Sequence, residues 1–151
     1  MKKTLSLFAF MMMALFGLVF TSCDGKDADV IEPEDLPTQI TTFLNTYYPG
    51  QQIMRSVKTT GKDGKYEIRL RNDHEIDFNE AGEWIDVDAP QGETIPGGIA
   101  PAPISLYVVT NYAGAGINEI SKESYGYDVE LTSGVDLEFD KNGKFLREDR
   151  H

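Results

Sequence analysis

An internal similarity between two stretches of the 151-residue chain limits its possible folds more than any other feature. Residues 43–50 (FLNTYYPG) and residues 107–114 (YVVTNYAG) align aromatic, aliphatic, threonine, tyrosine and glycine positions at a spacing of 64. Further along the spacing is 61, and the matched pairs include Tyr66 with Tyr127, Leu70 with Leu131, and Phe78 with Phe139. A difference of three residues fits within one loop, where insertions cost little. We therefore predict that the chain contains two copies of one structural unit.

Each copy is predicted to begin with a helix. In the first copy, Leu36, Ile40, Leu44 and Tyr47 recur at helical spacing, and the sequence Tyr-Pro-Gly at 48–50 ends the pattern. The corresponding helix of the second copy spans about residues 103–112, where β-branched valines lower the intrinsic helix propensity.

Alternating sequences after each helix predict short strands. Residues 66–70 and 75–79 place apolar side chains on one side and polar or charged ones on the other, and residues 127–131 and 135–139 repeat this pattern. Turn sequences lie between and after these strands, and strands joined by short hairpins are antiparallel. The predicted fold class is α+β, with two tandem repeats of a helix packed on an antiparallel meander.

The predicted organisation has five parts. Residues 1–22 form a signal peptide, residues 23–35 an acidic tether, residues 36–88 the first repeat, residues 89–98 a linker, and residues 99–148 the second repeat. The tether is acidic and lacks apolar periodicity, whereas the linker is rich in proline and glycine. A unit of about 55 residues is marginally stable alone, so we expect the copies to share a core or to pair their sheets.

The N-terminus has the pattern of an export signal. Lys2 and Lys3 precede an apolar run from residue 5 to residue 20, and the small residues Thr21 and Ser22 close it. The run is short for a bilayer span, which needs about 20 apolar residues. A permanent anchor helix is the alternative interpretation.

The sole cysteine, Cys23, directly follows this signal. Residues 19–23 (VFTSC) resemble the lipobox that lipoprotein signal peptidase reads, with Phe20 in place of the usual leucine. The resemblance implies that Cys23 becomes the acylated N-terminus, in the cell envelope at the periplasmic face or the outer surface of the outer membrane. A reactive free thiol or an intermolecular disulfide is the alternative.

The charge of the chain restricts its partners. The formal net charge is −11, and without residues 1–22, which hold two lysines and no acid, it is −13. Such a surface repels the phosphates of nucleic acids and anionic lipid headgroups. We predict no nucleic-acid partner and membrane contact only through the lipid anchor, while cations, basic peptides and basic protein surfaces remain.

The hairpin sequences at residues 78–84 (FNEAGEW) and 139–145 (FDKNGKF), together with the duplication, resemble those of the PepSY-like, β-lactamase-inhibitor-like family of exported bacterial proteins. The resemblance covers roughly residues 36–148 and implies a fold like that of PepSY and the β-lactamase-inhibitor protein (BLIP). Some relatives inhibit enzymes through the concave surface of the sheet, and some are suspected of responding to calcium. Most members of the family have no established activity.

Catalysis is not indicated by the sequence. Cys23 is the only thiol, and the two histidines, His74 and His151, lie in no metal-ligand or catalytic-triad spacing. No glycine-rich loop follows a strand and opens a helix, so phosphate binding is not indicated either. We predict no catalytic residue and no cofactor, and keep an uncharacterised hydrolase as the less favoured alternative.

A calcium loop is the sharpest candidate for metal binding. Glu138, Asp140, Asn142 and Asp149 fill positions 1, 3, 5 and 12 of such a loop. The sequence Asp-Lys-Asn-Gly also suits a hairpin turn, because it favours left-handed backbone conformations. The flanking phenylalanines fit strands, whereas the calcium loop is flanked by helices, so we predict a turn and keep calcium as an alternative.

A sheet with one covered face leaves the other face free for a partner. Tyr48, Tyr112 and Tyr125 lie just off the apolar stripes and are the predicted contact residues. The alternative is that they pack around helix ends and strand edges. We interpret the chain as a non-catalytic envelope lipoprotein that binds a protein or peptide, as an inhibitor or regulator of an envelope enzyme. A calcium-responsive envelope protein is the alternative function.

Overall fold

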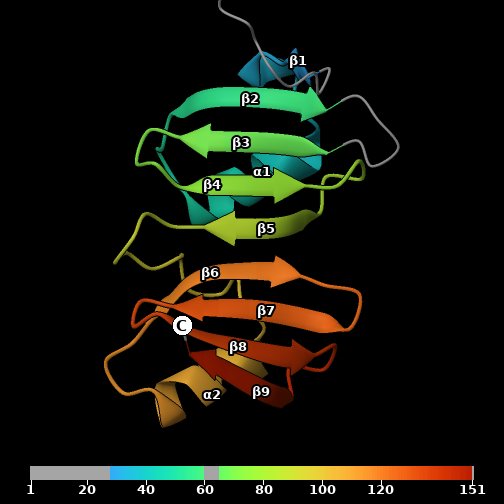
Figure 1. Cartoon of the computed structure of the whole chain (residues 1–151). Helices are drawn as coiled ribbons and strands as arrows, with labels where there is room; N and C mark the ends of the chain where they lie inside the picture. The colour runs from blue at the N-terminus through green and yellow to red at the C-terminus, as the bar shows by residue number, and fades with distance from the viewer. Residues whose placement is uncertain (1–27, 60–64, 151) are drawn as a thin grey trace, which may run out of the picture.

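The computed structural model describes residues 28–59 and 65–150. Within these ranges, nine antiparallel strands form a sheet whose spatial order is the order of the sequence, from β1 to β9 (Figure 1). The strands are β1 (Ala28–Val30), β2 (Ile53–Thr59), β3 (Tyr66–Leu70), β4 (Glu75–Phe78), β5 (Trp84–Asp88), β6 (Ile117–Lys122), β7 (Gly126–Leu131), β8 (Val135–Asp140) and β9 (Phe145–Arg150). The predicted α+β class is confirmed.

Two helices cover one face of this sheet (Figure 1). Helix α1 (Thr38–Tyr47) precedes β2–β5, and helix α2 (Ala102–Asn111) precedes β6–β9. Pro37 and Pro101 stand at the two N-caps, where a missing N–H costs nothing because helix starts leave their first N–H groups unpaired. Tyr48 and Tyr112 stand at the two C-caps, and each backbone N–H donates at 2.8 Å to a carbonyl of the last turn.

The core lies between the helices and the sheet. In the first half, the rings of Phe43 and Phe78 meet edge to face at 5.3 Å. In the second half, Tyr107 and Phe139 do the same at 5.4 Å. These residues are matched in the sequence at spacings of 64 and 61, so the same aromatic contact holds each helix to its strands.

The two halves are joined through strands β5 and β6. Asp86, Val87 and Asp88 pair with Ser121, Ile120 and Glu119, and buried residues of both halves form one core cluster. The expectation that the halves pair their sheets or share a core is therefore confirmed. The side-chain nitrogen of buried Asn118 lies within 3.1 Å of the carbonyls of residues 89, 90 and 93, which fastens the connecting segment to β6.

The prediction of a tether over residues 23–35 is wrong for residues 28–35. Strand β1 pairs with β2, and residues Pro33–Asp35 form a 3-10 helix before α1. The physical reason is the edge of β2, whose backbone groups need partners: Ile31 N donates to Ser56 O at 3.0 Å, and Ser56 Oγ donates back to Ile31 O. The signal peptide, Cys23 and residues 24–27 lie outside the described residues.

The part of the chain that the structure describes contains no helix long and apolar enough to cross a membrane.

Candidate functional site: the acidic face of the sheet

Carboxylates line up across the sheet face that the helices leave uncovered. Strand register places one residue from each of six successive strands, β4 to β9, directly opposite the next. These residues, which we call the acidic row, are Glu75, Asp88, Glu119, Glu130, Asp136 and Asp149. Like charges directly opposite each other on a sheet are destabilising, so this arrangement is not explained by fold stability.

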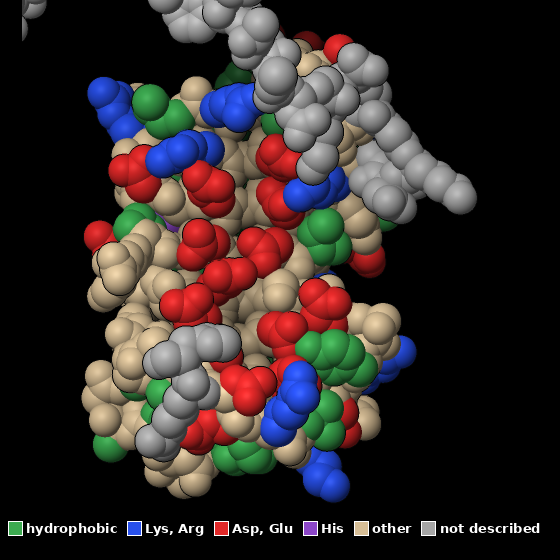
Figure 2. Space-filling model, viewed as in Figure 1, with side chains coloured by type: hydrophobic (Ala, Val, Ile, Leu, Met, Phe, Trp, Pro, Cys, Tyr) green, Lys and Arg blue, Asp and Glu red, His purple; other side chains and the backbone are tan. Residues whose placement is uncertain are grey.

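A second line of side chains runs parallel to the acidic row, two residues along each strand. Its members, from β3 to β9, are Glu67, Asp77, Asp86, Ser121, Asp128, Glu138 and Arg147. The two lines together are the acidic face. Figure 2 shows red carboxylates gathered over its middle, with blue cationic groups above and below.

Cationic partners are found near the two ends of the acidic face. Arg69 on β3 binds Glu75 at 3.1 Å, and Lys65, just before β3, forms ion pairs with Glu67 and Asp77. On β9, Arg147 pairs with Glu138. Among the described residues, no lysine or arginine forms an ion pair with the central carboxylates Asp86, Asp88 and Glu119.

The central carboxylates hold protons more tightly than free ones do. Burial, together with the charges of Glu119, Asp77 and Asp88, raises the pKa of Asp86 to about 7. Burial and the neighbouring acids also raise the pKa values of Asp88 and Glu119. Each proton that these carboxylates lose adds to the electrostatic repulsion between them. A cation bound here would therefore reduce a repulsion that destabilises the unbound protein.

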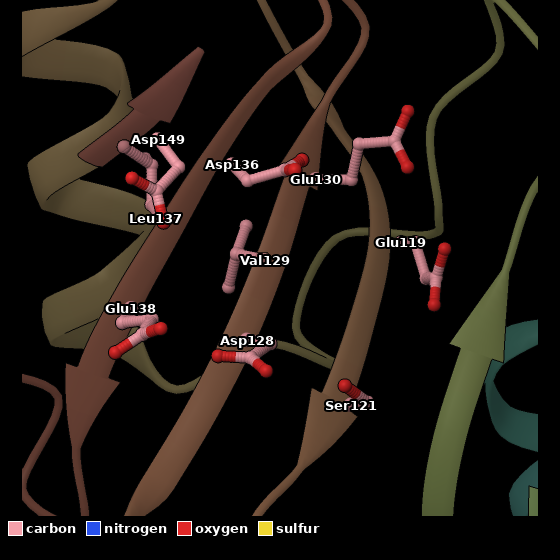
Figure 3. A pocket seen from close by; sticks show the side chains of 9 residues that line it. All are labelled: Glu119, Ser121, Asp128, Val129, Glu130, Asp136, Leu137, Glu138 and Asp149. Carbon is pink, nitrogen blue, oxygen red and sulfur yellow. The ribbon is translucent and has the colours of Figure 1, made fainter. Parts of the chain in front are cut away.

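The side chains over β6–β9 surround a shallow hollow, shown in Figure 3. Its walls carry Asp128, Glu130, Asp136, Glu138 and Asp149, and it also borders β7 and β8 at Val129 and Leu137, whose side chains are buried in the core. Among the described residues, no group of three or more His, Cys, Asp or Glu side chains has the arrangement that holds a metal ion. The carboxylates are spread along the face, which suits several separate cationic groups better than one ion.

The structure corrects the predicted role of Tyr48. Its side chain is 5% exposed, and its hydroxyl lies 3.2 Å from Nδ1 of His74, which is itself buried. Burial raises the pKa of Tyr48 and lowers that of His74. The sequence places His74 in a turn, but its ring faces the core, where the tyrosine hydroxyl needs a partner. Tyr48 is therefore mainly a core residue, and only a small part of it borders a surface pocket beside residues 94–97.

The other two predicted contact tyrosines lie on different elements. Tyr112 packs its ring 6.2 Å from Tyr107, and its hydroxyl donates to Glu148 on β9. Tyr125 is 40% exposed in the turn between β6 and β7, and its hydroxyl donates to Asp128 of the acidic face. Only Tyr125 is thus placed beside the acidic face, and its role as a contact stays a prediction.

The candidate calcium residues lie on a β hairpin. Asp140 Oδ1 accepts hydrogen bonds from the backbone N–H groups of Asn142 at 2.8 Å and of Lys144 at 2.9 Å, which shapes the turn between β8 and β9. Glu138 and Asp149 instead point into the hollow of the acidic face. The predicted turn is confirmed, and its carboxylate is used by the turn backbone.

The acidic row was missed by reasoning from the sequence. Acids at alternate positions on the strands show which side is wet, and that much is readable from the pattern. Which acid stands opposite which depends on register, and register is set here by the turns and by bulges on β2, β5, β6 and β9. The sequence does contain one indication of the row, because acidic residues recur at alternate positions along the predicted strands.

The fold and the site together define an α+β protein whose available surface is an open, acidic sheet face. The chain belongs to the family described as "Putative beta-lactamase-inhibitor-like, PepSY-like", whose model matches residues 21–74 and residues 64–147. The resemblance drawn from the hairpin sequences is thereby confirmed. No curated protein matches the chain.

Solved structures of similar proteins come from Bacteroides species. A "putative periplasmic protein" of Bacteroides vulgatus is 26% identical, with a TM-score of 0.78 over 84% of this chain and 100% of that one. A "putative calcium-regulated periplasmic protein" of Bacteroides thetaiotaomicron is 25% identical, with a TM-score of 0.77 over 82% of this chain and 98% of that one. A second Bacteroides vulgatus protein, 24% identical with a TM-score of 0.75, shares the fold.

Proposed function

We propose that this chain is a non-catalytic binding module whose acidic face docks onto a basic surface of a protein or peptide. The observation that carries the proposal is the acidic row, six carboxylates in register across six strands. The central carboxylates of the face have no ion-pair partner among the described residues, and the charge of Lys65 offsets their mutual repulsion only in part. A partner that supplies cations relieves it on binding.

The spacing of the acidic row favours a partner with several cationic side chains in line. Neighbouring strands lie about 4.8 Å apart, so six strands present carboxylates over about 24 Å. Side chains on one face of a helix are about 5–6 Å apart, a comparable spacing. Binding by such a surface would make the chain an inhibitor or regulator of a partner in the envelope, the role that its family resemblance implies.

We further propose that the two halves are copies of one unit and that the protein is held in the envelope through acylated Cys23. The matched aromatic contacts and the equivalent bulges support the duplication. The export pattern of residues 1–22 supports the envelope location, and two of the similar structures are described as periplasmic proteins. Incorporation of an azido fatty acid that is lost in Cys23→Ser would support the anchor, and incorporation that persists would refute it.

Binding can be tested with an oligolysine peptide as the defined probe. Isothermal titration at pH 8 with the purified Cys23→Ser chain should show saturable binding that weakens steeply with added salt, because the contacts are ionic. The triple variant Asp88→Asn, Glu119→Gln, Glu130→Gln should weaken binding by at least about tenfold, or about 1.4 kcal/mol.

A matched control separates a defined site from bulk negative charge. The triple variant Glu34→Gln, Glu80→Gln, Glu123→Gln removes the same charge from exposed acids outside the acidic face. This control should retain peptide affinity within about twofold. Equal losses in the two triple variants would show that net charge alone binds the peptide, and the proposal would fail.

Calcium response is the second candidate function, because one similar structure is described as calcium-regulated and the acidic face offers oxygen ligands. Titration of calcium against magnesium, followed by calorimetry, decides this candidate. A single calcium site that magnesium does not fill would favour it over docking of a basic partner.

A further inference from the structure

Helix α2 exposes apolar side chains on its outer side. Leu106 is 65% exposed and Val109 is 70% exposed, and they lie three residues apart on one side of the helix. The matched positions on α1, at a spacing of 64, are Thr42 and Asn45. Exposed apolar residues at these positions are thus no requirement of the fold, since α1 covers its half of the sheet without them.

The apolar character continues from α2 into a neighbouring groove. Val109 forms part of this groove, and its other apolar walls come from α2, the loop after α2, β6 and the segment that connects the halves. Those residues are Ile95, Pro96, Val108, Ala115 and Ile117. Leu106, Val109 and this groove together form what we call the α2 patch. In this patch the protruding side chains of Leu106 and Val109 lie next to the groove.

Charge decides what can cover the α2 patch. Helix α2 contains no charged residue, while the acidic face lies on the opposite side of the sheet (Figures 1 and 2). Two chains with a net charge of −11 each repel strongly when their acidic faces meet. The helix-covered side is where a second copy can approach with the acidic faces turned away from each other.

We propose that the α2 patch is a self-association surface, on which a second copy of this chain packs its own α2 about a two-fold axis. In such an isologous contact each copy supplies both the protruding side chains and the groove, so the juxtaposition of the two on one surface is what a symmetric pair needs. The contact centres on one ten-residue helix, which is small beside the about 800 Å² per partner of a standard interface. The dimer is therefore weak and reversible, and it stands independently of the function proposed for the acidic face.

Sedimentation equilibrium of the purified Cys23→Ser chain tests the proposal. The wild-type patch should give a concentration-dependent monomer–dimer equilibrium that strengthens with added salt, because salt screens the repulsion between acidic bodies. Added salt should instead weaken peptide binding by the acidic face. A failure of one proposal can therefore be told apart from a failure of the other.

The α2 patch can be removed by giving α2 the polar residues that α1 has at the matched positions. Leu106→Thr with Val109→Asn copies the residues at the matched positions and should weaken dimerisation by at least about tenfold. Met54→Thr, at an exposed apolar residue of β2, is the matched control and should leave it unchanged. Circular dichroism confirms that each variant is folded.

Three results would overturn the proposal. A wild-type chain that remains monomeric at high concentration in high salt has no such interface, and a double variant that still dimerises uses another surface. A monomer that binds uncharged phosphatidylcholine vesicles through Leu106 and Val109 has a lipid surface as the occupant instead of a second copy.

Discussion

Asp86 lies near the centre of the acidic face, opposite Asp77 on β4 and Ser121 on β6. Its pKa of about 7 arises from burial first and then from the charges of Glu119, Asp77 and Asp88, partly offset by Lys65. In the unfolded chain the same carboxyl titrates near 4. Between these two pKa values the native state binds more protons than the unfolded state, so this residue makes stability fall as pH rises through that window.

Asp86→Asn should therefore stabilise the protein more at pH 8 than at pH 5. A raised pKa of this size, discounted for solvent screening, corresponds to a gain of about 1–2 kcal/mol at pH 8. At pH 5, about one unit above the unfolded pKa, only about a third of this cost is present, so the gain from the substitution should be correspondingly smaller.

Urea denaturation at the two pH values measures this difference. Glu80→Gln, at an exposed acid in a turn, is the control and should change stability little at either pH. An equal gain for Asp86→Asn at pH 5 and pH 8 would show that the cost of Asp86 is not its charge.

At the scale of secondary structure elements, the hairpin of β7 and β8 depends on one glycine. A Cβ built on Gly126 would lie 2.0 Å from the carbonyl oxygen of Phe139, on the strand paired with it. A contact this short with backbone cannot be relieved by a side-chain movement, so the two strands must separate locally. Gly126→Ala should therefore destabilise the fold by about 3 kcal/mol or more.

The control for this prediction is Gly97→Ala. No atom lies within 4 Å of the Cβ that it would add, and its stability should change by less than about 0.5 kcal/mol. Thermal denaturation of both variants makes the comparison, and a Gly126→Ala chain that melts with the wild type would contradict the prediction.

The same elements show how far sequence reasoning reaches. Helix α1 and strands β3, β4, β7 and β8 follow clear periods of 3.6 or 2, so their type and approximate bounds could be predicted. Strands β2 and β6 could not, because a bulge next to Met54 in one and Asn118 in the other breaks the alternation. The burial of Tyr48 and His74 also depends on a tertiary contact between them, which no local pattern encodes. The uncovered side of the strands was predictable, but the acidic row on it was not.

At the scale of the whole molecule, the acidic face and the two helices lie on opposite sides of the sheet (Figures 1 and 2). The turn that holds Asp140 uses its Oδ1 for two backbone N–H groups, while Glu138 and Asp149 belong to the acidic face. Calcium then finds dispersed carboxylates rather than six or more converging oxygens. Its stabilising effect should come from screening and should be weak.

Millimolar calcium and a sodium salt of matched ionic strength should therefore raise the melting temperature by similar amounts. Differential scanning calorimetry of the Cys23→Ser chain in the two salts provides the measurement. One stoichiometric calcium site, removed by Asp140→Ala and not filled by magnesium, would contradict this expectation.

The strand order of the sheet has a consequence for how the chain can be assembled. Each strand from β2 to β9 pairs with the strand that directly precedes it in sequence, without a crossover. A chain delivered end-first, as through an export pore, therefore meets at each step a partner that has already emerged. After β1, no strand has to wait for a later segment, and none has to be inserted between two formed neighbours. The sheet can grow in the order of delivery, and at each stage its two edges are β1 and the newest strand.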